Sequence, residues 1–192
     1  KLSALRKLVQ EAADNGLLDP VHANGISNVR GVKTEGRRAG NWLTREQAER
    51  LLNAPDATTL KGQRDRAILA VMLLAGLRRH EVAALTVEHI QQRDGRWAIV
   101  DLVGKRGKVR TVPIAPIVKT LIDDWTSAAG ITSGPLWRGF RKGNHVLPEP
   151  GISSQAVWRV VEEYAPRVLG FKIAPHDLRR TCRTGLARLG VD

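Results

Sequence analysis

Apolar residues recur at helical spacing near the start of the chain. The pattern predicts an amphipathic helix over residues 1–16, which Asn15-Gly16 would end. Its apolar positions are Leu2, Leu5, Leu8, Val9 and Ala12. From residue 20 to residue 41 the periodicity is lost and glycine is frequent, which is the composition of a linker.

A second periodic region starts at Trp42. Thr44 and Gln47 have the spacing of a capping box, which predicts a helix over 45–53. Residues 64–75 are apolar nearly all round and predict a buried central helix. A short helix is expected around 80–86, after a turn at Gly76.

Two stretches rich in β-branched residues, 97–103 and 109–114, flank a Gly-Lys-Arg-Gly-Lys loop and predict a β-hairpin. Helices are expected at about 116–128, 153–168 and 176–189, with a Gly- and Pro-rich loop over 134–151. The predicted fold class is therefore mainly α with a small antiparallel β-sheet, an α+β domain. The predicted organisation is a helix in 1–18, a linker in 19–41 and a domain in 42–192.

Composition narrows the possible functions. The formal net charge is +12 and the pI is near 10.8, with basic residues spread along the whole chain. Such a balance favours a polyanionic partner, because each phosphate neutralised by Lys or Arg releases counterions. The longest apolar run, 67–75, is too short to span a bilayer, and Cys182 is the only cysteine. We therefore expect no membrane segment, no internal disulfide, no zinc site and a cytoplasmic protein.

Three segments carry candidate chemistry: 75–81 (AGLRRHE), 104–113 (GKRGKVRTVP) and 176–181 (HDLRRT). His176 and Arg179 are three residues apart on a predicted helix, so they share one face of it. An arginine fork can bind two phosphate oxygens at once and does not deprotonate. Phosphoryl transfer builds negative charge on equatorial oxygens, which preorganised cations stabilise.

In this order and separation, the three segments resemble the tyrosine recombinases, which include phage integrases and the recombinases that resolve chromosome dimers. The resemblance covers about residues 42–192, which it implies are a catalytic domain without its C-terminal part. Residues 1–18 resemble the last helix of the family's DNA-clamping core-binding domain. It implies an integrase-like catalytic fold and site-specific recombination, integrative or excisive, of double-stranded DNA. It also implies a 3′-phosphotyrosine intermediate, no metal or ATP, and a tetramer of the full-length protein on DNA. The source would be a bacterium or a phage.

The resemblance implies roles residue by residue. Arg78 and Arg179 would bind the non-bridging oxygens of the scissile phosphate. Lys105 would protonate the leaving 5′ hydroxyl, and His176 would assist proton transfer and phosphate binding. Glu81, three residues after Arg78, would orient that guanidinium. The remaining basic residues of the three segments are expected to contact the DNA backbone: Arg79, Arg106, Lys108, Arg110 and Arg180.

The nucleophile of the family, a tyrosine after the H-x-x-R pair, is not expected in this chain. Tyr164 is the only tyrosine, it precedes His176, and core packing explains its place in a helical segment. The five tryptophans are scattered and are expected to serve in packing, with no base-stacking platform among them.

Two other readings stay open at this point. A non-catalytic DNA-binding remnant of an integrase would keep the same phosphate-binding residues. A type IB topoisomerase would use a similar constellation, although the short interval between Lys105 and His176 favours a recombinase. The sequence does not reveal the target site, the direction of the reaction or accessory proteins.

Overall fold

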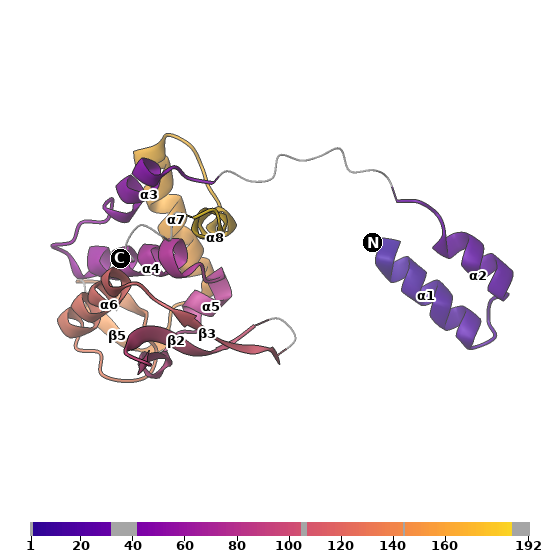
Figure 1. Ribbon diagram of the computed structural model, residues 1–192, viewed down its shortest axis with the longest axis horizontal. Helices are drawn as coiled ribbons and strands as arrows, with labels where there is room; N and C mark the ends of the chain where they lie inside the picture. The colour runs from indigo at the N-terminus through magenta and orange to yellow at the C-terminus, as the bar shows by residue number, and fades with distance from the viewer. Residues whose placement is uncertain (1, 32–41, 105–106, 144, 186–192) are drawn as a thin grey trace. The chain divides into compact units, whose positions relative to one another are not determined.

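The computed structural model describes residues 2–31, 42–104, 107–143 and 145–185. The chain divides into two units, 1–39 and 40–192 (Figure 1). No helix in these described ranges is long and apolar enough to cross a membrane.

The first unit is a pair of helices, α1 (Leu2–Asp14) and α2 (Pro20–Ser27), packed against each other. The predicted linker over 19–41 is therefore wrong in its first part. Asp19 caps α2 by accepting the Val21 N–H at 2.8 Å, and Pro20 occupies the first helical position, where no N–H is needed. This helix was not predicted, because it buries only Ala23 and its apolar residues therefore show little helical periodicity.

The second unit is built around a buried helix, α4 (Leu60–Ala70), which continues into a π-helical turn, η1 (Val71–Ala75). Residues 67–72 have no exposed surface, as the predicted central helix requires. The described helices packed around it are α3 (Arg45–Leu52), α5 (Arg79–Ala83), α6 (Pro116–Ala128), α7 (Ser154–Leu169) and α8 (Pro175–Arg183). The capping box of Thr44 and Gln47 is confirmed, with both reciprocal hydrogen bonds formed.

The predicted hairpin is confirmed and gains a third strand. After a short 3₁₀ turn, η2 (Val87–His89), β1 (Ile90–Arg93) pairs antiparallel with β2 (Arg96–Val103). β2 pairs in turn with β3 (Val109–Pro113), and Figure 1 shows the end of this hairpin extending away from the helices. Lys105 and Arg106 lie outside the described residues, but the base of their loop is closed by the Gly104 N–H, which donates to the Lys108 carbonyl at 2.7 Å.

Two further boundaries differ from the sequence predictions. The segment 134–151 is not a loop throughout, because β4 (Arg138–Arg141) and β5 (His145–Gly151) form a second antiparallel pair within it. Helix α8 ends at Arg183, earlier than predicted, since a turn at 184–185 with Gly185 at φ 107° follows. The fold class, mainly α with small antiparallel sheets, is confirmed.

Candidate phosphate-binding site

The left-handed turn at Gly76 positions the first predicted site residue, Arg78. Gly76 follows the π-helical turn with φ +61°, a conformation that glycine adopts without strain. A Cβ at this position would also lie 2.9 Å from the Cys182 Sγ of α8. The absence of a side chain therefore lets α8 approach the end of η1 closely.

Helix α8 presents the other two predicted residues, His176 and Arg179. Asp177 caps its start by accepting the Ala174 N–H at 2.9 Å. The buried Thr181 hydroxyl donates to the Asp177 carbonyl and accepts the Leu43 N–H, both at 2.9 Å. These contacts fix the helix, so its exposed face has a defined orientation.

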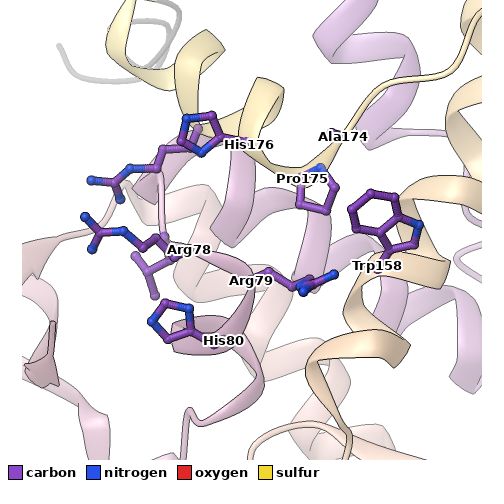
Figure 2. A pocket seen from close by; sticks show the side chains of 9 residues that line it. Arg78, Arg79, His80, Trp158, Ala174, Pro175 and His176 are labelled. Carbon is purple, nitrogen blue, oxygen red and sulfur yellow. The ribbon is translucent and has the colours of Figure 1, made fainter. Parts of the chain in front are cut away.

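Arg78, His176 and Arg179 line one pocket of about 260 Å³, which Figure 2 shows. Arg179 donates a hydrogen bond to the Gly76 carbonyl, so α8 and the Gly76 turn are joined at the site itself. Burial and the positive charge of Arg78 lower the pKa of Arg179. The guanidinium stays charged, and two like charges held this close favour an anion between them.

Glu81 binds two arginines rather than the one predicted. Its carboxylate accepts the Arg78 backbone N–H and the Arg78 Nη1, each at 2.8 Å, which gives the predicted buttress. It also accepts Arg110 Nη1 at 2.9 Å and Arg110 Nη2 at 2.8 Å. Burial raises the pKa of the Glu81 carboxyl, but the hydrogen bonds from Arg110 and Arg78 outweigh it and lower the pKa to about 2.

Arg110 thus connects the β-hairpin to the site. A Cβ added at Gly104 would lie 3.1 Å from the Arg110 Nη1. The guanidinium therefore passes beside the base of the loop that contains Lys105. The sequence predicted DNA contact for Arg110 but not this ion pair, since the partners are 29 positions apart. Its contact with DNA stays a prediction, as do those of the exposed Lys108 and the partly exposed Arg180.

The pocket also contains residues for which the sequence gave no catalytic role: Leu77, Arg79, His80, Trp158, Ala174 and Pro175. Trp158 was expected to serve only in packing, but its ring lies under the Arg79 guanidinium, whose central carbon is 5.3 Å from the ring centroid. Trp125 and Trp137 are fully buried, as predicted. The sequence does not distinguish Trp158 from these two tryptophans, because Arg79, the residue that Trp158 contacts, is 79 positions away along the chain.

Among the described residues, the polar lining consists of arginine and histidine side chains and contains no carboxylate. The described residues hold no cluster of His, Cys, Asp or Glu suited to a metal ion. Tyr164 is 6 % exposed, and its hydroxyl donates to Asp65 at 3.1 Å, away from the pocket lining. The site therefore offers cations and hydrogen-bond donors for an anionic group, which makes it a candidate phosphate-binding site.

The chain matches the model of the phage integrase family over residues 41–192. It is 30% identical over 193 residues to the tyrosine recombinase XerC of Pseudomonas entomophila, covering 100% of this chain and 60% of that protein. It is 33% identical over 153 residues to the tyrosine recombinase XerD of Neisseria meningitidis serogroup B, covering 78% of this chain and 50% of that protein.

Solved structures agree on the fold. A XerA recombinase matches with a TM-score of 0.58 and 15% identity, covering 100% of this chain and 70% of that one. A XerH site-specific recombinase bound to its palindromic difH substrate matches with a TM-score of 0.61 and 18% identity, covering 84% of this chain and 46% of that one. The chain belongs to the phage integrase family, the tyrosine recombinases. It spans about half to three fifths of the length of the XerC and XerD relatives.

Proposed function

We propose that this chain is the phosphate-binding part of a site-specific DNA recombinase that acts through a 3′-phosphotyrosine intermediate. The observation that carries the proposal is the pocket in which Arg78, His176 and Arg179 meet, with no carboxylate among the described residues of its lining. Its ligand is a phosphodiester of double-stranded DNA, the partner that the charge of +12 favours.

Each residue has a role in this mechanism. Arg78 and Arg179 bind the non-bridging oxygens of the scissile phosphate and stabilise the charge of the transition state. His176, exposed at the pocket rim, takes part in proton transfer. Lys105 protonates the leaving 5′ hydroxyl; the described base of its loop, tied to Glu81 through Arg110, supports this placement.

The nucleophile is a tyrosine outside this chain. Tyr164 is a poor candidate, since burial raises the pKa of its hydroxyl and Asp65 holds it. The full-length protein would assemble as a tetramer on DNA in the cytoplasm, and unit 1–39 would belong to its DNA-clamping domain. The apolar side chains that unit 1–39 leaves exposed, such as Leu8 and Leu17, are consistent with a place in a larger helical domain.

The test is a salt titration of duplex binding by fluorescence anisotropy. The chain should bind DNA with an affinity that falls steeply as KCl rises. Arg78→Ala or Arg179→Ala should reduce the log–log slope by about 0.9 for each phosphate that is no longer neutralised. Arg167→Ala is the matched control, since this exposed arginine lies outside the pocket lining. A salt-independent affinity, or equal effects of Arg78→Ala and Arg167→Ala, would contradict the proposal.

A further inference from the structure

Two consecutive arginines of the pocket point in different directions. In Figure 2, Arg78 lies on the same side as His176, whereas Arg79 extends to the other side and reaches Trp158. Both side chains line the same pocket. The wall therefore carries a cation at some distance from the Arg78–Arg179 pair.

Within the described residues, the hydrogen-bond donors of Arg79 are not engaged. Across the described parts of the chain, Arg79 has neither a hydrogen-bond partner for its side chain nor an ion pair, while Arg78 and Arg110 both bind Glu81. The one described partner of its guanidinium is the face of the Trp158 ring, whose centroid lies 5.3 Å from the Arg79 Cζ. A cation–π contact of this kind holds the guanidinium over the ring and leaves its N–H groups available to an anion.

Trp158 is a fixed support for this arginine. It lies on α7, against which α5 packs, and it is only partly exposed. On another side the ring borders a second hollow of about 210 Å³, whose lining includes both Lys172 and Glu162. Beyond Trp158 the described lining includes a carboxylate, Glu162, whereas on the near side its charged residues are the arginines of the phosphate pocket, of which Arg79 is the one at Trp158.

We propose that Arg79, held over Trp158, binds the phosphodiester next to the scissile one in the same DNA strand. This inference rests on the proposed function, because Arg78 and Arg179 must hold the scissile phosphate for the neighbour to lie beyond them. Along a DNA strand each phosphate is followed by another of equal charge, so a strand crossing the pocket brings a second anion to its wall. Arg79 thereby fixes the direction of the strand, and Trp158 is a positioning residue that limits the rotamers Arg79 must lose on binding.

The first experiment measures duplex binding over a range of KCl concentrations. Arg79→Ala should lower the affinity about fivefold or more and reduce the log–log slope by about 0.9, the value for one phosphate. Arg167→Ala is a close control, because that guanidinium also lies over an aromatic ring, Tyr164, at 5.9 Å, but does not line the pocket. If Arg79→Ala behaves like Arg167→Ala while Arg78→Ala weakens binding, this inference fails and the proposed function stands. If Arg78→Ala has no effect either, the proposed function fails as well.

The second experiment tests adjacency with short ligands that compete with the duplex. A 5′-phosphorylated dithymidylate, which has two consecutive phosphates, should compete several-fold better than thymidine 5′-monophosphate. That advantage should disappear in Arg79→Ala and persist in Arg167→Ala; its persistence in Arg79→Ala would mean that Arg79 binds elsewhere on the DNA.

The third experiment tests whether the Trp158 ring positions Arg79. Trp158→Phe keeps an aromatic face and should bind the duplex within about twofold of the unsubstituted chain, whereas Trp158→Leu should bind several-fold more weakly. Thermal unfolding by circular dichroism identifies any loss that comes from the fold, and Arg79→Lys gives an independent check, since an ammonium lacks the planar fork. Equal affinity of Trp158→Leu and Trp158→Phe would remove Trp158 from the proposal.

Discussion

At the scale of single residues, Glu81 determines the geometry of two arginines that come from different elements. Its side chain is 1% exposed, and both of its oxygens accept charged donors. A buried carboxylate is stable only when it is paired in this way. Glu81 occupies the Arg78 Nη1 donor, but two guanidinium groups share its single negative charge, so the cluster of Arg78, Arg110 and Glu81 keeps a net positive charge that attracts an anion.

Replacing Glu81 with Gln should therefore destabilise the fold. The amide retains one acceptor and turns an NH₂ group toward a guanidinium, so we expect a loss of roughly 2–3 kcal/mol in the free energy of unfolding by urea. Glu49→Gln is the control; Glu49 pairs with Arg45 at the surface, where the change should stay within about 0.5 kcal/mol.

The loss of stability in Glu81→Gln should also depend on pH. Because the folded pKa of Glu81 is about 2, below the ordinary value of 4.5, its contribution is complete above pH 4.5 and decreases as the pH falls toward 2. The stability difference between the unsubstituted chain and Glu81→Gln should shrink across that window. A constant difference would show that the carboxylate charge is not what stabilises the pair.

At the scale of elements, the junction of η1 and α8 forms the site. A buried helix ends in a left-handed glycine, and α8 lies directly against that turn through Cys182 and Arg179. The Cys182 thiol also donates to the Leu74 carbonyl at 3.5 Å. Two helices far apart in the sequence are thus brought close enough for Arg78 and Arg179 to share one ligand.

Gly76→Ala should destabilise the fold by more than the cost of placing alanine at a positive φ. Gly170 is the matched control, because it too ends a helix in the left-handed region, at φ +78°, but a Cβ there meets nothing within 4 Å. Gly170→Ala should cost about 1 kcal/mol, and Gly76→Ala about 1–3 kcal/mol more, because its Cβ meets Cys182.

The double variant Gly76→Ala/Cys182→Ala separates crowding from the backbone effect. If crowding against the sulfur is responsible, urea unfolding should show that the double variant is more stable than the additive loss from the two single changes. Additive losses would place the strain in the backbone alone.

At the scale of the whole molecule, we expect this chain to supply charge stabilisation and proton transfer but not the nucleophile. Incubated with a nicked suicide substrate, it should form no covalent adduct with DNA on a denaturing gel, whereas a longer version that includes the family's tyrosine should form one. In the longer version, Arg78→Ala or Arg179→Ala should reduce adduct formation by on the order of 100-fold or more. Lys105→Ala should slow cleavage and leave phosphate binding largely intact.

Tyr164→Phe provides the decisive control for this assignment. It should cost about 1 kcal/mol of stability by removing the hydrogen bond to Asp65, without changing adduct formation. An adduct from the chain itself that disappears in Tyr164→Phe would overturn the assignment of the nucleophile.

The sequence alone determined the features that depend on neighbours along the chain. The capping box at Thr44, the apolar run of the central helix and the β-branched stretches of the hairpin are patterns of residues close together along the chain, so they predicted elements correctly. Arg78, His176 and Arg179 could be chosen because their chemistry and order are visible without coordinates. The sequence did not predict helix α2 or the additional strands of the second unit, since short elements bury too few side chains to give a periodic pattern.

Only the tertiary structure decided which of these side chains meet. The bond between Arg179 and the Gly76 carbonyl spans 103 positions, and the one between Arg110 and Glu81 spans 29. The direction of Arg79 toward Trp158 is equally absent from the sequence pattern, although Arg79 directly follows Arg78. Local spacing fixes the face of a helix on which a residue lies. Its partner depends on how separate elements pack, and in this protein that packing forms the pocket lined by Arg78, His176 and Arg179.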